Sequence, residues 1–188
     1  MTLAEFLAEV VQQLEHASIE YMIGGSVASS IYGDPRTTRD IDMVVEVTEA
    51  SLRALFGAVD RSVVYIDEPP SGQPIIAGQM FNLLDLRGGW KVDLIVRKAR
   101  PFSEIEFARR RRLVVLGVMA SMASAEDVLL TKLEWAVRSG SSRQVDDARG
   151  IVAVQGSSLD LEYLRRWAPE LGVEDLLELV LTDSSSDQ

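Results

Sequence analysis

Short apolar segments typical of β-strands alternate with helical patterns over residues 1–116, and only helical patterns follow from Ser124 onward. Strands and helices in alternation bury their apolar faces against one another, as helices packed on a sheet. We therefore predict an α/β (α+β) fold with a mixed sheet flanked by helices, followed by a C-terminal helical bundle. The expected divisions are a first domain at 1–120, a helical region at 121–182 and a disordered tail at 183–188.

Two local patterns mark the ends of predicted elements. Thr2 and Glu5 have the spacing of a capping box, which indicates the start of an amphipathic first helix. The turn Arg87-Gly88-Gly89 separates two apolar runs and predicts a hairpin. The other expected helices are 26–32, 49–59, 103–110, 124–138, 142–154, 160–167 and 173–181. The expected strands are 21–23, 40–47, 62–66, 80–86, 90–96 and 113–116, and a loop is expected at 69–72.

The chain of 188 residues has no cysteine and one histidine. Disulfides, thiolate zinc sites and histidine-rich metal sites are therefore excluded, so any metal must be held by oxygen ligands. The formal net charge is −10, which weighs against broad binding to nucleic acid through phosphate contacts. A nucleotide could still bind through a local basic patch or a bound cation.

The sequence gives no sign of a membrane partner. Its N-terminal segment carries acids and lacks the basic region that begins a secretory signal. No apolar run reaches about 18–20 residues, the length needed to span a bilayer. We expect a cytoplasmic protein.

Three carboxylates form the strongest candidate for a functional site. Residues two apart on a strand face the same side, so Asp40 and Asp42 project together. Asp93 joins them if its own strand is a neighbour, and three hard oxygen ligands suit Mg²⁺. Two other interpretations of Asp93 remain open: a solvated strand residue, or an ion-pair partner of Lys91.

A second pattern, Gly24-Gly25-Ser26, lies between a predicted strand and a predicted helix. Glycine lets the backbone approach a triphosphate closely, and the helix N-terminus and the Ser26 hydroxyl can donate hydrogen bonds to phosphate oxygens. With bound metal ions, such a site can activate an attacking hydroxyl and stabilise departing pyrophosphate.

The glycine turn, the Asp-x-Asp strand and the later carboxylate together resemble the signature of the nucleotidyltransferase superfamily, which has a polymerase-beta-like fold. The likeness covers most of the chain, from about Met22 to Val154. It implies a Mg²⁺-dependent enzyme that moves a nucleoside monophosphate from a nucleoside triphosphate such as ATP to a hydroxyl of tRNA or protein. The positions that match the motif are Gly25 and Ser26 for phosphate, and Asp40, Asp42 and Asp93 for metal and catalysis.

The wording Arg-x-Thr-x-Asp-Ile-Asp, which ends at Asp42, resembles a branch containing abortive-infection-type toxins and uncharacterised bacterial proteins. In the toxins, a Lys on one C-terminal helix and an Asp on the next complete the site. Lys132 matches that Lys, and Asp147 matches that Asp, with Asp146 as its competitor. The same wording favours Arg36 over Arg39 as a phosphate contact. A cognate antitoxin is then an implied partner.

Several alternatives to this function remain open. Within the same fold, the acceptor could be an antibiotic hydroxyl. From a different class, the chain could be a catalytically silent binding protein or antitoxin. The three acids Asp40, Asp42 and Asp93 could also have a purely structural role.

Other conspicuous residues have plain interpretations. The run Arg109-Arg110-Arg111-Arg112 is either a solvated face or a patch for RNA or a triphosphate. His16 is expected to interact with the C-terminus of the first helix. Three tryptophans are expected in the core or at an interface: Trp90, Trp135 and Trp167.

Overall fold

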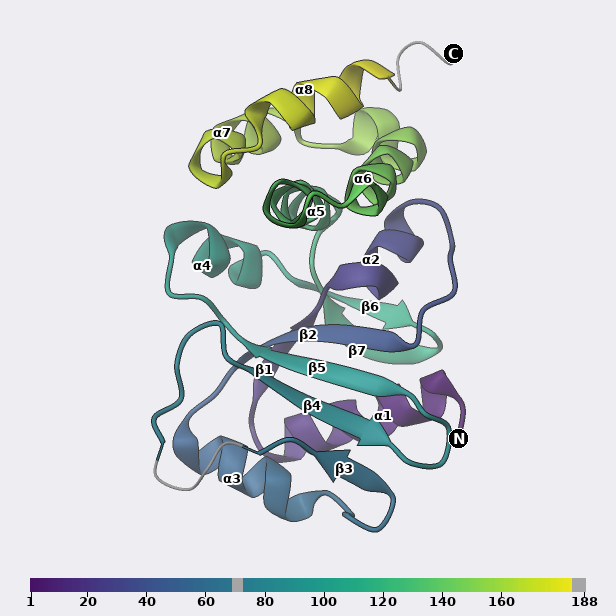
Figure 1. The fold of residues 1–188 in the computed structure, drawn as a ribbon, viewed down its shortest axis with the longest axis vertical. Helices are drawn as coiled ribbons and strands as arrows, with labels where there is room; N and C mark the ends of the chain where they lie inside the picture. Colours follow the sequence, from purple (N-terminus) through teal and green to yellow (C-terminus); the bar gives the residue numbers. More distant parts are fainter. Residues whose placement is uncertain (69–72, 184–188) are drawn as a thin grey trace. The chain divides into compact units, whose positions relative to one another are not determined.

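The computed structural model describes residues 1–68 and 73–183, and these residues form seven strands and eight α-helices (Figure 1). The predicted α/β fold with a mixed sheet is confirmed. The loop predicted at 69–72 lies outside the described residues, as do residues 184–188 of the tail predicted as disordered. Asp183 ends the last helix.

Two compact units make up the chain. Unit 1 contains Met1–Gly24 and Thr38–Met122, and unit 2 contains Gly25–Thr37 and the residues from Ala123 onward. The chain therefore passes from one unit to the other three times. The domain boundary expected after residue 120 stays a prediction.

Unit 1 is built on a seven-stranded sheet with the order β3-β4-β5-β2-β1-β7-β6. Two pairs are parallel, β2 with β5 and β1 with β7, and the other neighbours are antiparallel. The strands are β1 (Glu20–Ile23), β2 (Asp40–Glu46), β3 (Val64–Ile66), β4 (Met80–Asp85), β5 (Lys91–Val96), β6 (Arg111–Val115) and β7 (Val118–Met122). The helices of this unit are α1 (Leu3–His16), α3 (Glu49–Ala58) and α4 (Pro101–Ala108).

One face of this sheet is apolar and lines the core of unit 1. Along β2, Ile41, Met43 and Val45 are fully buried and alternate with more exposed residues, as expected where one face is covered. Figure 1 shows α1 and α3 together on one side of the sheet and α4 on the other. Phe56 of α3 packs edge-to-face on Phe81 of β4, with 5.7 Å between ring centroids. The apolar face thus fixes which side of each strand remains for polar residues.

The predicted elements of unit 1 are present, and their ends differ from the predicted ones by up to two residues. Helix α4 begins at Pro101, two residues before the predicted start, because proline is well suited to the first helical turn. Strand β7 was not predicted. It pairs with β6 through a tight turn in which Leu116 and Gly117 both have positive φ, 51° and 84°. That turn type usually carries Asn-Gly or Asp-Gly, so Leu-Gly gave no hairpin signal.

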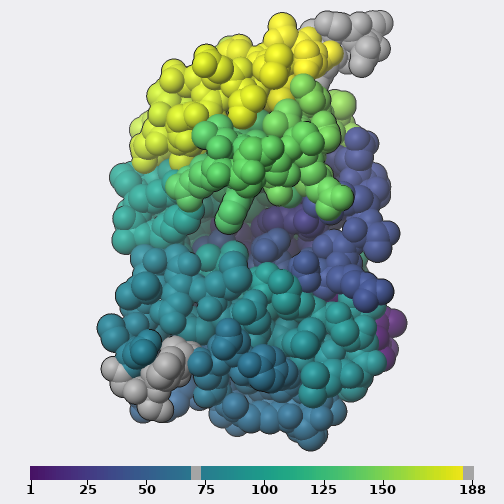
Figure 2. All heavy atoms as spheres, in the orientation of Figure 1, coloured from purple at the N-terminus to yellow at the C-terminus, as the bar shows by residue number. Residues whose placement is uncertain are grey.

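In the described residues of unit 2, all regular elements are helices. Helix α2 packs on both α5 and α6. Helix α7 packs on α5, α8 packs on α5 and α6, and α7 and α8 pack on one another. Figure 2 shows the side chains of α5–α8, coloured green to yellow, in continuous contact. Its elements are α2 (Gly25–Tyr32), α5 (Ala125–Ser139), α6 (Ser142–Gln155), the short 3₁₀ turn η1 (Gly156–Ser158), α7 (Leu161–Leu171) and α8 (Glu174–Asp183).

Helix α6 approaches the end of α2 closely because two glycines face each other. A Cβ at Gly33 would lie 2.7 Å from the backbone of Gly150 and Ile151. A Cβ at Gly150 would lie 3.0 Å from the Asp34 carboxylate. A side chain at Gly33 would therefore collide with the backbone of α6, and one at Gly150 would press on Asp34.

A buried acid stabilises the start of α5. Ser124 caps this helix as predicted, accepting a hydrogen bond from the Asp127 N–H. The Asp127 side chain is fully buried and accepts hydrogen bonds from the Ser124 hydroxyl at 2.6 Å and the Tyr163 hydroxyl at 2.5 Å. Tyr163 belongs to α7, so this carboxylate joins two helices.

In the part of the chain that the structure describes, no helix combines the length and apolar character needed to cross a membrane.

The predicted hairpin between β4 and β5 depends on another buried acid, Asp85. Its carboxylate accepts hydrogen bonds from Arg87 Nε at 2.6 Å and from the Gly88 N–H at 2.7 Å. Arg87 also donates to Glu9 of α1 at 2.8 Å. Burial favours the neutral carboxyl, but the hydrogen bonds from Arg87 and Gly88 outweigh burial and hold the pKa of Asp85 below its ordinary value.

We expect Asp85→Asn to lower the free energy of unfolding by about 1–2 kcal/mol near neutral pH, because a charged acceptor is lost. A lowered folded-state pKa stabilises the protein above the unfolded pKa of about 3.9. That stabilisation is lost as the pH falls through the folded value, so the difference between the two proteins should shrink in acid. Urea unfolding across this range measures it, with exposed Asp67→Asn as the control. A difference that stays constant with pH would contradict this account.

Candidate functional site

The three predicted carboxylates lie in one row on the sheet of unit 1. Strands β2 and β5 are parallel, and their register pairs Asp42 with Asp93 and Asp40 with Lys91. Paired residues and residues two apart along a strand share a face. We call these four residues the carboxylate row. It occupies the face opposite Ile41 and Met43.

Lys91 forms ion pairs within this row. Its Nζ lies 2.9 Å from Asp93 Oδ2 and 3.7 Å from Asp40 Oδ1. The hydrogen bond to Asp93 is the main cause that raises the pKa of Lys91 above its ordinary value, so the ammonium stays charged. The interpretation of Asp93 as an ion-pair partner of Lys91 is confirmed, and Asp93 is not a solvated residue, because its side chain is only 8% exposed.

The acidic side chains of the carboxylate row are of the chemical type that binds a hard divalent cation. All three acidic side chains offer oxygen, the ligand that Mg²⁺ prefers. Asp93 Oδ1 is buried and makes no hydrogen bond to any residue that the structure describes, so one oxygen remains to coordinate an ion. Within the described ranges, however, no three acidic or His side chains come close enough together to hold a metal. Magnesium binding stays a prediction.

A second cluster lies in unit 2 and joins α5, α6 and the loop after α2. Arg36 forms a two-pronged pair with Asp147, with Nε 3.1 Å from Oδ1 and Nη2 3.1 Å from Oδ2. Lys132 Nζ lies 2.7 Å from the same Oδ2. Asp147 thus holds two cations on α5 and on the loop after α2. We call Arg36, Lys132 and Asp147 the basic cluster, because its positive groups outnumber its carboxylate.

The serine of the glycine turn also joins the basic cluster. Ser26 Oγ accepts a hydrogen bond from Arg36 Nη2 at 2.6 Å. Gly25, which opens α2, has φ of 57°, a conformation that side chains disfavour. Ser29 was not singled out from the sequence, yet its hydroxyl lies 3.4 Å from Asp147 Oδ2. Its spacing of three residues from Ser26 on one helix was the available signal.

The competing residues fall outside this cluster. Asp146 is 67% exposed and pairs with Arg149, while the Asp147 side chain is 9% exposed. Arg39 belongs to unit 1, and its carbonyl oxygen accepts a hydrogen bond from the Lys91 N–H. The structure therefore brings Arg36 and Asp147 together, and neither Arg39 nor Asp146 joins them.

The predicted site residues accordingly form one group in each unit. Asp40, Asp42 and Asp93 belong to unit 1, while Gly25, Ser26, Arg36, Lys132 and Asp147 belong to unit 2. The sequence did not predict that Lys91 would also pair with Asp40, or that Asn82 of β4 would lie beside Asp93. Both share the face of the carboxylate row.

The arginine run pairs with acids of its own unit. Arg110 pairs with Glu20 at 3.1 Å and Arg112 with Glu15 at 2.8 Å. The Arg110 guanidinium also stacks on the Phe107 ring, 4.1 Å from its centre. These contacts favour the solvated-face interpretation of the run.

The remaining conspicuous side chains are structural. His16 Nδ1 lies 3.0 Å from the Gln12 carbonyl oxygen, which confirms its place at the end of α1. Trp167 is buried, and Trp90 donates a hydrogen bond to the Met1 carbonyl oxygen at 3.1 Å. Trp135 is not in the core, because about half of it is exposed.

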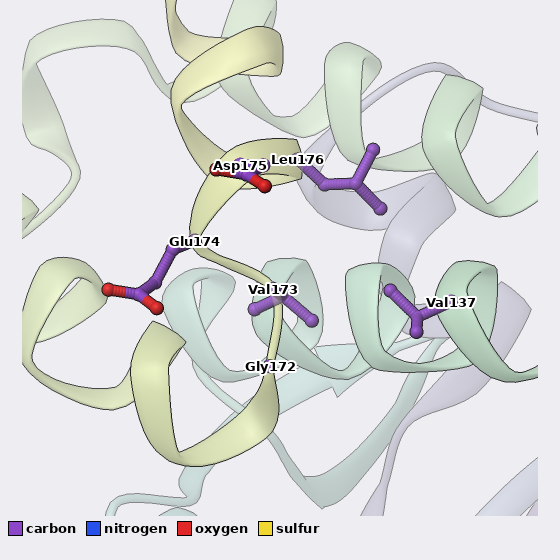
Figure 3. Close-up of a pocket in the computed structure, with 6 residues that line it drawn as sticks. All are labelled: Val137, Gly172, Val173, Glu174, Asp175 and Leu176. Atoms are coloured by element: carbon purple, nitrogen blue, oxygen red, sulfur yellow. The ribbon is translucent and has the colours of Figure 1, made fainter.

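An open hollow of about 270 Å³ lies in unit 2. Figure 3 shows Val137 of α5 facing Leu176 of α8, with Glu174 extending to the other side. The lining residues are Val137, Gly172, Val173, Glu174, Asp175 and Leu176. None of the predicted site residues lines it.

Comparison with solved structures identifies the fold. A nucleotidyltransferase-like protein from Paracoccidioides brasiliensis matches at 22% identity and a TM-score of 0.57, covering 94% of this chain and 92% of that one. ANT(2″)-Ia in complex with adenylyl-2″-tobramycin matches at 14% identity and a TM-score of 0.60, covering 88% of this chain and 96% of that one. The lincomycin-bound lincosamide adenylyltransferase LnuA matches at 11% identity and a TM-score of 0.53, covering 80% of this chain and 98% of that one.

These likenesses confirm that the chain has the nucleotidyltransferase fold. No protein-family model matches the sequence, and no curated protein does.

We expect Asp147→Ala to destabilise the protein by about 3–5 kcal/mol, because it leaves the buried Lys132 without its anion. Lys132→Met should cost much less, since Asp147 keeps its pair with Arg36. Denaturant unfolding of the two variants gives the comparison. Asp146→Ala is the matched control, one residue away and exposed, and should unfold like the wild type.

Acid should weaken the same interaction. Burial favours the neutral form of Asp147, but hydrogen bonds from Lys132 and Arg36 prevail and hold its pKa below the ordinary value. The stability that ionised Asp147 contributes is therefore present above the pKa of this carboxyl in the unfolded chain. It is lost as the pH falls through the pKa in the folded protein. If Asp147→Ala and Lys132→Met lowered the free energy of unfolding equally at neutral pH, the central role of Asp147 would be contradicted.

Proposed function

We propose that the protein is a metal-dependent nucleotidyltransferase that moves a nucleoside monophosphate from a nucleoside triphosphate to a hydroxyl acceptor. The observation that carries the proposal is the register of β2 and β5, which sets Asp42 beside Asp93 on the same face as Asp40. The unpaired, buried oxygen of Asp93 supports a cation there. The nucleotidyltransferase fold supports the reaction class.

In the proposed reaction, Asp40 and Asp42 bind Mg²⁺, and Asp93 assists them or acts as the base. Bound magnesium supplies positive charge that offsets the charge of the triphosphate and of the departing pyrophosphate. The acceptor oxygen forms a bond to the α-phosphorus, and the bond from that phosphorus to the pyrophosphate oxygen breaks. The bonding pair leaves with pyrophosphate, and the hydroxyl proton passes to Asp93 where Asp93 acts as the base.

The basic cluster is proposed to bind the phosphates. Arg36 and Lys132 are the cations, and Arg36 has a planar fork of donors that suits phosphate oxygens. The Ser26 hydroxyl and the backbone at Gly25 add hydrogen-bond donors. Asp147 positions the two cations. Release of Arg36 from Ser26 would free that hydroxyl for the nucleotide.

An antibiotic hydroxyl is a second candidate acceptor, and the solved structures favour it. Two proteins of this fold were solved with antibiotic ligands, adenylyl-2″-tobramycin in one and lincomycin in the other. A tRNA or protein acceptor, a toxin role, a cognate antitoxin and a cytoplasmic location rest on the sequence alone.

Asp42→Asn should reduce nucleotidyl transfer at least about a hundredfold, because a metal ligand loses its charge. Label transfer from α-labelled nucleoside triphosphates in the presence of Mg²⁺ measures it. Glu46→Gln is the matched control, since Glu46 is on the same strand and face but pairs with Arg97. Transfer that is equal in wild type and Asp42→Asn would contradict the proposed enzyme.

An acceptor panel should separate the two candidates. The purified protein is incubated with labelled triphosphate and, in separate reactions, an aminoglycoside, a lincosamide, total tRNA or a cell extract. Label on an antibiotic, with resistance on expression, would support the antibiotic acceptor. Label on RNA or protein, with arrested growth, would support the toxin interpretation. Each transfer should depend on Asp42.

A further inference from the structure

We propose that Lys91 is a built-in counter-ion of the carboxylate row, which a divalent cation must displace in order to bind. This inference rests on the proposed metal site at Asp40, Asp42 and Asp93. It goes further by assigning a role to a residue that the reaction itself does not use. Lys91 then controls how readily the site takes up a cation.

The geometry places the Lys91 ammonium where a cation would be held. Its Nζ contacts two of the three predicted ligands, Asp93 at 2.9 Å and Asp40 at 3.7 Å. Lys91 is the register partner of Asp40 and lies two residues before Asp93, so its side chain projects over the same face. An ion bound by both acids would have to lie close to the ammonium.

Burial explains why such a counter-ion is needed. The Asp93 side chain is 8% exposed, and one of its oxygens has no hydrogen-bond partner in the described residues. A buried carboxylate without a compensating charge is costly. In the absence of metal, the ammonium supplies that charge and keeps neighbouring acids from repelling one another.

The counter-ion is also able to leave. The Lys91 side chain is 35% exposed, and a lysine stem can carry its ammonium out to solvent. A divalent ion interacts more strongly with the acids than a single positive charge does, so it can replace the ammonium. The exchange costs affinity, because the cation must compete with a group tethered in the site.

Removing the ammonium should therefore tighten cation binding. We expect Lys91→Met to bind Mn²⁺, used as the probe, about tenfold more tightly than the wild type. Lys91→Arg keeps the charge and should stay close to the wild type. Lys98→Met is the matched control, since it removes the same charge beyond the end of β5. Titration of the full chain, with free Mn²⁺ measured by electron paramagnetic resonance, gives the affinities without any turnover.

Thermal unfolding provides a second measurement. In chelator, Lys91→Met should unfold at a lower temperature than the wild type, because Asp93 loses its partner. Saturating Mn²⁺ should raise the unfolding temperature more for this variant. Lys91→Gln is a substitute if the Met variant does not fold.

Asp42→Asn, in the wild-type and Lys91→Met backgrounds, separates the two proposals. Binding that needs Asp42 but is not tightened by Lys91→Met would overturn the counter-ion role and leave the metal site standing. The metal site, and this inference with it, would be overturned if neither the wild type nor Lys91→Met bound Mn²⁺. The same holds if binding persisted after Asp42→Asn. Asp42-dependent binding that tightens in Lys91→Met supports both.

Discussion

The register between β2 and β5 is the constraint on which the candidate chemistry depends. The two strands pair in parallel so that Asp42 meets Asp93 and Asp40 meets Lys91. A slip of one residue would turn these groups into the core and expose Ile41 and its neighbours, which are fully buried. The apolar face under α1 and α3 therefore fixes the positions of the polar groups on the other face. Core packing and function are set by the same pairing.

Charge is divided between two groups of opposite sign, which the net charge of −10 does not reveal. The carboxylate row in unit 1 is negative, so it attracts cations. The basic cluster in unit 2 is positive, because Arg36 and Lys132 share the single anion Asp147. The negative net charge disfavours binding to nucleic acid in general.

Local patterns predicted most of the fold, and long-range pairing limited the rest. The Thr2 capping box, the Asp40–Glu46 strand and the hairpin before β5 follow from neighbouring residues. Strand β7 was missed because its turn begins with Leu116 instead of Asn or Asp. The Lys91 contact with Asp40 depends on strand register between distant segments, and the buried Asp127 depends on a hydroxyl from another helix. Single-sequence patterns do not encode either contact.

The chain passes between its two units three times, so the protein cannot be divided into them by one cut. A fragment ending at Met122 would carry Gly25–Thr37 without α5 and α6, on which α2 packs. A fragment starting at Ala123 would retain Lys132 and Asp147 but lose Arg36, so Asp147 would keep one of its two cations. Cutting the chain at a single point thus cannot yield either unit intact.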